Sequence, residues 1–400
     1  MVEPRTITES GAVHDQREIA AVLEVLNETT LDLGPRVAEF ERRGAELLAK
    51  QHAVFVNSGS SALRLAIDLL DCQPGDEVIT PALTFSTDVA PLVQSGIIPA
   101  FVDVEADTLQ IDVSKIEEMI GPRTKGMLIP NLVGNVPDWD QIQAISDRHG
   151  IPVIEDSCDV VDSWLRGRRT GERVPITVTS FARSHAMTAA GMGGMVAVND
   201  GDWYDKTLVR RRWGRRSESF LYGTRKDDPN RFGSLADGTP YDFVFVFDDA
   251  GYNFEPSELM AAYGLVQMDK LAEFNARRRH NFAYLDAVFS AHEDVVIRPR
   301  MTEGAETIWM RYPFTLRDGV DRTMFQEFLA DRNVSTRMVW TGNILRQPGF
   351  AHIAHRQPAD GLPETDVVMD RALTLPLHHG LTSDDLGYIV ECLDELFRLL

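Results

Sequence analysis

The stretch between residues 57 and 67 has the composition of a phosphate-binding turn. It reads "NSGSSALRLAI" and places Gly59 and Ser60 between an expected strand and an expected helix. Free N–H groups at a helix N-terminus, with serine hydroxyls beside them, can bind a phosphate, and a glycine lets the backbone approach it closely. A helix N-cap without any ligand explains the same residues equally well. Taken alone, the stretch leaves both explanations open.

Two other stretches place functional side chains at the ends of expected strands. In "VIEDSCD" (153–159), Asp156 could hold a protonated ring nitrogen through a charge-assisted hydrogen bond. In "TFSTDVAP" (84–91), Phe85 could stack on a flat cofactor. A capped strand end and a core phenylalanine are the commoner explanations of each residue by itself. The signal comes from the order of these motifs along the chain, followed by "SF" and "GGMV" between residues 180 and 196.

The elements that must position these residues form an alternating pattern. From residue 52 onward, apolar strand-like runs alternate with helical stretches. Buried strands joined by helices imply an α/β fold with a mainly parallel sheet covered on both faces, and ligands in such folds bind at the carboxyl ends of the strands. We expect a large domain over residues 1–290 and a small C-terminal α+β domain over residues 291–400.

Charge and composition limit the possible partners. A net charge of −21 over 400 residues disfavours nucleic acid and an anionic membrane surface. No apolar run is long enough to cross a bilayer, and the first residues, "MVEPRTITES", lack the basic and apolar regions of a signal peptide. Cys72, Cys158 and Cys392 show no metal-binding spacing. We therefore expect reduced thiols, no metal site and a cytoplasmic protein.

The chain resembles the nucleotide-sugar aminotransferase and dehydratase group of fold-type I pyridoxal phosphate (PLP) enzymes over nearly its whole length. Besides the motifs above, the resemblance is carried by "GDEVITPALTFSTDVAPLVQSGIIPAFVDVE", "GYNF" and "LPLHHGLTSDDL". It implies that Gly59, Ser60 and Ser180 hold the cofactor phosphate. It further implies that Phe85 stacks on the pyridine ring and that Asp156 pairs with the ring nitrogen.

One position departs from the aminotransferases of this group. They read "SF", three residues and then the lysine that forms a Schiff base with PLP, and the same offset from Ser180 leads here to His185. None of the six lysines falls in this segment. The chain is thus most similar to the hexulose 3-dehydratase subgroup, in which histidine replaces that lysine, as "EDSCD", "NLVGNVPDWD" and "TGNILRQPGF" also indicate. Because the pKa of histidine lies near neutrality, His185 is the candidate catalytic acid–base.

The resemblance to the 3-dehydratases implies a cofactor bound without a covalent link. Pyridoxamine phosphate (PMP) would supply the amine that condenses with the C4 ketone of a nucleotide-linked 4-keto-6-deoxyhexose, and the C3 hydroxyl would then leave. One branch of these enzymes carries a cysteine cluster for an iron–sulfur centre, but residues 213–232 contain no cysteine, and a [2Fe–2S] centre needs four ligands. The resemblance therefore implies the other branch, in which L-glutamate regenerates PMP.

Further residues are implied for the partner subunit and the substrate. Asn253 of "GYNF" would reach the phosphate in the neighbouring subunit, which implies a homodimer with shared active sites. In the C-terminal part, Arg337, Asn343 and Arg346 are candidates for binding the sugar or the carboxylate of the amino donor. Surface arginines are common, so a purely structural role remains equally open.

Two other functions compete with the dehydratase hypothesis. A PLP-dependent nucleotide-sugar aminotransferase would need another base in place of the missing lysine. A catalytically inactive homologue that binds a nucleotide sugar or PMP would have no need for a proton-transfer group such as His185. The sequence also leaves the nucleotide and the hexose open.

Overall fold

The computed structural model describes residues 5–28, 31–226 and 232–400. Its centre is a seven-stranded sheet with the strand order β1-β9-β8-β5-β4-β2-β3. The strands β8, β5, β4, β2 and β3 are parallel, and β9 runs antiparallel to both of its neighbours. The strands are β1 (His52–Val56), β2 (Glu77–Pro81), β3 (Ile98–Val102), β4 (Thr124–Pro130), β5 (Val153–Asp156), β8 (Ile176–Ser180) and β9 (Gly194–Val198). The mainly parallel sheet of the predicted α/β fold is confirmed.

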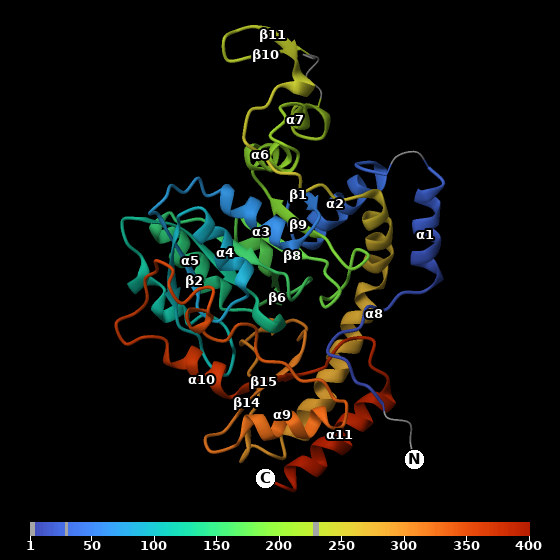
Figure 1. The fold of residues 1–400 in the computed structure, drawn as a ribbon, viewed down its shortest axis with the longest axis vertical. Helices are drawn as coiled ribbons and strands as arrows, with labels where there is room; N and C mark the ends of the chain where they lie inside the picture. The colour runs from blue at the N-terminus through green and yellow to red at the C-terminus, as the bar shows by residue number, and fades with distance from the viewer. Residues whose placement is uncertain (1–4, 29–30, 227–231) are drawn as a thin grey trace.

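Helices cover both faces of this sheet (Figure 1). Alternation along β1 shows why, because Val54 and Val56 pack towards α3 and α6 whereas Phe55 packs towards α2 and α8. The covering helices are α2 (Pro35–Leu47), α3 (Gly59–Asp68), α4 (Ser86–Gln94), α5 (Trp139–His149), α6 (Gly201–Arg211) and α8 (Glu258–Phe289), and α1 (Gln16–Leu26) packs against α8. Short 3-10 helices lie between them at η1 (Val113–Lys115), η2 (Glu117–Met119), η3 (Leu132–Gly134) and η4 (Thr170–Arg173).

The C-terminal part has a sheet and a core of its own. Its antiparallel strands follow the order β12-β14-β15, and α9 and α11 pack against them around Phe289, Tyr312 and Phe325. The elements are β12 (Val296–Ile297), β14 (Tyr312–Leu316), α9 (Arg322–Ala330), η6 (Ile344–Arg346), α10 (Pro363–Arg371), β15 (Ala372–Leu375) and α11 (Ser383–Phe397). Helix α8 runs from the large sheet to this part (Figure 1) and ends at Phe289, one residue before the boundary that we predicted. The division into two domains stays a prediction.

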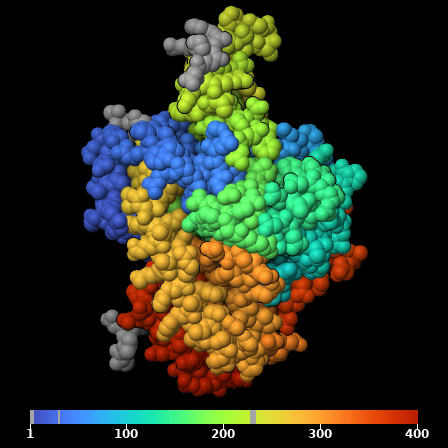
Figure 2. All heavy atoms as spheres, turned by 180° about the vertical axis from the view of Figure 1, so that it is seen from behind, coloured from blue at the N-terminus to red at the C-terminus, as the bar shows by residue number. Residues whose placement is uncertain are grey.

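A narrow projection extends from the body of the molecule on the side of α6 (Figures 1 and 2). It contains α7 (Ser217–Leu221), β10 (Phe232–Ser234), β11 (Pro240–Asp242) and η5 (Phe243–Phe245). A further small sheet joins β6 (Trp164–Leu165), β7 (Arg168–Arg169) and β13 (Ala305–Glu306). Within the described residues, no helix is both long and apolar enough to span a bilayer.

Candidate active site

A cavity of about 340 Å³ opens beyond the carboxyl ends of β4, β5 and β8. Small-molecule sites in proteins usually measure roughly 300–1,000 Å³, so this cavity can hold a cofactor. Its walls come from the first turns of α3 and α4, the strand ends and the loop between β8 and β9. The residues predicted from the sequence that line it are Gly59, Ser60, Phe85, Asp156, Ser180 and His185.

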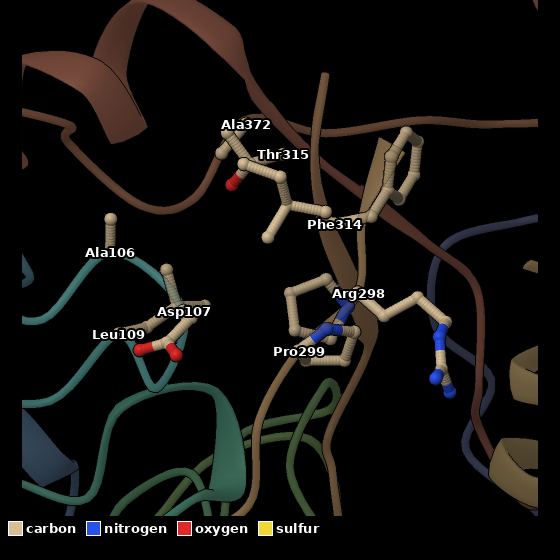
Figure 3. A pocket seen from close by; sticks show the side chains of 10 residues that line it. Ala106, Asp107, Leu109, Arg298, Pro299, Phe314, Thr315 and Ala372 are labelled. Atoms are coloured by element: carbon tan, nitrogen blue, oxygen red, sulfur yellow. The ribbon is translucent and has the colours of Figure 1, made fainter. Parts of the chain in front are cut away.

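A second hollow lies where the large sheet meets the C-terminal sheet, and it is far smaller. Ala106, Asp107 and Leu109 face Pro299 and Thr315 across a space of about 10 Å³ (Figure 3). Such a volume holds about one water molecule. It is therefore a packing gap. The cavity beyond β5 is the candidate active site because the residues predicted from the sequence line it.

The first turn of α3 forms one end of the cavity. The leading N–H groups of a helix have no partner inside the helix. The Oγ atom of Ser58 accepts from the N–H of Ser61 at 3.1 Å, which leaves the N–H groups of Gly59 and Ser60 for a ligand. A Cβ atom on Gly59 would lie 2.6 Å from the Cβ atom of Ser180, so only glycine fits beside this serine. These donors meet at a helix N-terminus, which is a suitable phosphate site.

Asp156 supplies an acidic group to the cavity from the end of β5. It is buried at the end of β5, and its Oδ1 atom accepts from the N–H of Cys158 at 2.9 Å. Burial raises the pKa of Asp156 to about 6, against the hydrogen bonds that Cys158 donates. The carboxylate is thus ionised at neutral pH, and a cationic ring nitrogen beside it would stabilise that charge further.

Phe85 offers an exposed aromatic ring in the same cavity. It is the N-cap residue of α4, and half of its surface is exposed. Trp340, which comes from the C-terminal part, approaches it edge-on with ring centroids 6.1 Å apart. A flat ring can therefore stack on Phe85 while Trp340 borders the cavity.

His185 lies in the loop between β8 and β9, with its imidazole held in one orientation. Its Nδ1 atom contacts the carbonyl oxygen of Cys158, and its own carbonyl oxygen accepts from Arg278 at 3.1 Å. A carbonyl can only accept, so we assign the proton to Nδ1, which leaves Nε2 unprotonated. Burial lowers the pKa of His185 to about 4, and the nearby positive charges of Arg278 and Arg311 act in the same direction. The side chain is therefore a neutral base at physiological pH.

Three further lining residues were missed from the sequence. Asp88 lies in the first turn of α4, three residues after Phe85, a spacing that places both on one side of the turn. Asp159 is the second acid of the quoted strand end, and its Oδ2 atom accepts from Val133 N at 2.7 Å and from Trp340 Nε1 at 3.0 Å. Burial raises the pKa of Asp159 to about 7. Trp340 had no local signal, because it reaches the cavity from a distant part of the chain.

The other predicted residues lie outside this cavity. Arg337 pairs with Glu9 of the N-terminal segment, and Arg346 pairs with Asp366 at 3.3 Å and with Asp370. Asn343 also donates to Asp366, at 2.9 Å.

Asn253 is exposed at the foot of the projection, where it pairs with Arg212 through a β-bridge. Its role towards a neighbouring subunit, like the substrate roles of the other three, stays a prediction.

Taken together, the cavity fits PLP or PMP. The helix N-terminus offers N–H groups for a phosphate, Phe85 offers a stacking face, and Asp156 offers an anion for the ring nitrogen. The glycine cradle at Gly59 is the observation that best tests this fit, since any side chain there would collide with Ser180.

Comparisons with known proteins agree with this geometry. The chain is 34% identical to the dTDP-4-dehydro-2,6-dideoxy-D-glucose 3-dehydratase of Saccharopolyspora spinosa, over 97% of this chain and 86% of that protein. It is 29% identical to the GDP-perosamine synthase of Caulobacter vibrioides, over 96% of each chain. The E. coli GDP-4-keto-6-deoxy-D-mannose-3-dehydratase with bound hydrated PLP has a similar structure, with a TM-score of 0.86 and 26% identity over 97% of this chain and 100% of that chain.

The relatives therefore include 3-dehydratases as well as a GDP-perosamine synthase, and PLP or PMP is the cofactor typical of the group. A family model matches residues 13–394. The chain belongs to the DegT/DnrJ/EryC1/StrS aminotransferase family.

Proposed function

We propose that this protein uses non-covalently bound PMP to remove the C3 hydroxyl of a nucleotide-linked 4-keto-6-deoxyhexose in deoxysugar biosynthesis. The observation that carries the proposal is that His185 lines the cavity from the β8–β9 loop. An aminotransferase would need a lysine at this position to bind the cofactor covalently. All six lysines belong to the described part of the chain, and none lines the cavity. Lys50 contacts the carbonyl oxygen of Gly171, and Lys270 pairs with Glu18 at 2.6 Å.

The cavity residues divide the work of binding in this proposal. Gly59, Ser60 and Ser180 hold the phosphate, Phe85 supports the ring, and Asp156 keeps the ring nitrogen protonated. The chemistry that the cofactor supplies when bound is an amine for the C4 ketone and a ring that accepts electrons.

His185 moves the protons. Its unprotonated Nε2 would be the base for the proton transfers that the bound cofactor requires, while the contact from Nδ1 to Cys158 holds the imidazole in place. The pKa of about 4 is lower than the near-neutral value that we expected from the sequence, because the side chain is buried. It keeps His185 neutral before the reaction, makes the imidazole a weaker base and makes its protonated form a stronger acid. The same side chain can therefore deliver the proton that the departing C3 hydroxyl needs.

We further propose that L-glutamate is the amino donor and that no iron–sulfur cluster takes part. The chain has three cysteines, and a [2Fe–2S] centre needs four ligands. The overall reaction then balances, because the 4-keto sugar and glutamate give the 3-deoxy-4-keto sugar, 2-oxoglutarate and ammonia. A homodimer with shared sites, to which Asn253 contributes, belongs to the same proposal.

Product mass is the decisive measurement. The purified protein is incubated with PLP, L-glutamate and a panel of nucleotide 4-keto-6-deoxyhexoses, without a reductase. We expect loss of one oxygen from the sugar, with 2-oxoglutarate and ammonia released in equal amounts. An amino sugar would instead favour the aminotransferase that the perosamine synthase relative represents. Ligand binding without any turnover would favour an inactive binding protein.

A further inference from the structure

A further carboxyl group lines the cavity together with Asp156, and the function proposed above does not use it. Asp88, in the first turn of α4, is completely buried. The hydroxyl of Thr84 donates to its Oδ2 atom. Its Oδ1 atom is buried and has no hydrogen-bond partner among the described residues. A buried carboxylate oxygen without a donor is costly, so this atom needs an explanation.

Asp156 is another acid in the wall of the same cavity. Asp88 and Asp156 line the same cavity, and the side chain of each acts on the pKa of the other. Two buried carboxylates in contact cannot both be ionised, because like charges repel strongly where water is excluded. If Asp88 carries a proton on Oδ1, that atom becomes a donor and Asp156 becomes its acceptor. Both the repulsion and the unpaired oxygen are then removed.

We propose that Asp88 is a positioning residue that stays protonated, donates a hydrogen bond from Oδ1 to Asp156, and so aims the ionised Asp156 at the ring nitrogen of the cofactor. Only the last step rests on the proposed function. The proton shared between the two acids is a property of the protein without its cofactor.

The surroundings of the two acids determine which of them keeps the proton. Asp156, Cys158 and Asp159, at and just after the end of β5, interact electrostatically with Asp88, and Thr84 of its own segment donates a hydrogen bond to it. Burial and then the charge of Asp156 raise the pKa of Asp88 well above its usual value. The pKa of Asp156 reaches only about 6, because Cys158 and Asp88 donate to it. The proton therefore belongs to Asp88 at neutral pH.

Asp156 is also connected to the catalytic histidine. The N–H of Cys158 donates to Asp156, and the carbonyl oxygen of the same residue holds Nδ1 of His185. A shift of the Asp156 carboxylate thus reaches His185 through one residue. In this proposal Asp88 acts on His185 through Asp156 and Cys158.

The first test measures how the stability of the cofactor-free protein depends on the proton bound to Asp88. A carboxyl whose pKa is raised in the folded state binds a proton that the unfolded chain has released, so folding stability falls as pH rises above about 4. Asp88→Asn is nearly isosteric and removes this titration. We expect the melting temperature of wild type to fall relative to that of Asp88→Asn between pH 5 and pH 8. A difference that does not change with pH would overturn the proposal.

The second test separates the hydrogen bond from the charge. Asn can still donate to Asp156 and accept from Thr84, whereas Asp88→Leu can do neither, although both variants lack the charge. We expect PMP to bind Asp88→Asn within about threefold of wild type and Asp88→Leu roughly 10- to 100-fold more weakly, the range for loss of a hydrogen bond to a charged group. Equal PMP affinity of the Leu variant and wild type would contradict the positioning role. Neither test depends on which sugar the enzyme converts.

Discussion

The residues predicted from the sequence fall into two groups, one that lines the cavity and one that lies outside it. Asp156 and Ser180 end neighbouring strands of the large sheet, and both line the cavity. Arg337 and Arg346 belong to the segment between α9 and α10, and both pair with acids of their own chain outside the cavity. The carboxyl ends of parallel strands meet at one edge by topology, whereas a long side chain on a connecting segment can turn towards any nearby charge.

The same C-terminal segment nevertheless contributes to the cavity through an aromatic residue. Trp340 has a positive φ of 43°, which a side chain of this size rarely adopts. Its Nε1 donates to Asp159 at 3.0 Å, and Asp159 also holds the N–H of Val133, whose φ is 58°. One buried acid thus ties the two parts of the chain together beside the site. Strand-end residues thus line the cavity because of the sheet topology, whereas the arginines are held outside it by nearby acids. Mutations can test both statements.

The largest effect is expected at the β8–β9 loop. His185→Asn removes the proposed base, and general acid–base groups contribute about 100- to 10,000-fold to rate, so we expect the rate of sugar dehydration to fall by that factor. PMP affinity should stay within a few-fold of wild type, since His185 is not among the proposed phosphate or ring ligands. His280→Asn, at an exposed position on α8, is the matched control and should keep full activity. Full activity of the His185 variant would remove the basis of the proposed function.

The next largest effect is expected in the free energy of unfolding, which should depend on pH through His185. The pKa of His185 falls from 6.5 to about 4 in the folded protein. Between these values the unfolded chain binds a proton that the folded protein does not, so stability is lost as the pH falls from 7 towards 4. The loss amounts to at most about 3 kcal/mol, at 1.36 kcal/mol per unit of pKa. Unfolding free energies of the cofactor-free wild type and His185→Gln at pH 7 and pH 4.5 measure it, and parallel pH curves would show that His185 titrates normally.

The phosphate cradle should respond to a single methyl group. Gly59→Ala places a Cβ atom 2.6 Å from the Cβ of Ser180, and overpacking of this kind costs about 1–3 kcal/mol. We expect a lower melting temperature and about tenfold weaker PMP binding. Gly387→Ala in α11 is the control, because open space surrounds that glycine, and a helical Gly→Ala change there should stabilise the protein by about 0.4–1 kcal/mol. Unchanged PMP affinity in the Gly59 variant would place the phosphate elsewhere.

The fold and one wall of the site were predictable because both depend on local patterns. The alternation of apolar runs and helices implied the parallel sheet, with Gly59 and Asp156 at its carboxyl edge, whereas Ser180 was implied by the family resemblance. Asp88 was within reach of the same reasoning, since it follows Phe85 by one helical turn. It was missed because a lone acid near a helix N-terminus usually acts only on the helix dipole.

The remaining features depend on contacts between distant segments. No pattern near Trp340 indicates that Asp159, 181 residues earlier, accepts its indole N–H. Likewise, nothing near Arg337 shows that Glu9 lies beside it. Such pairings are decided by how the C-terminal part and the N-terminal segment pack on the large sheet. The orientation of the His185 ring also depends on a tertiary contact, with the carbonyl oxygen of Cys158.

The smallest effect is expected for a substitution of Arg346. This substitution tests whether the arginine stays paired with its acids, outside the cavity, while the enzyme turns over. Its side chain is about half exposed and pairs with Asp366 and Asp370, and such surface pairs contribute less than about 1 kcal/mol. If the arginine stays in these pairs, Arg346→Ala will change neither the melting temperature by more than a few degrees nor the KM for the sugar or for glutamate. A KM raised more than tenfold for one substrate, with kcat retained, would mean that Arg346 leaves its acids to bind that substrate. Because a guanidinium already neutralised by two carboxylates attracts an anion weakly, we expect the first result.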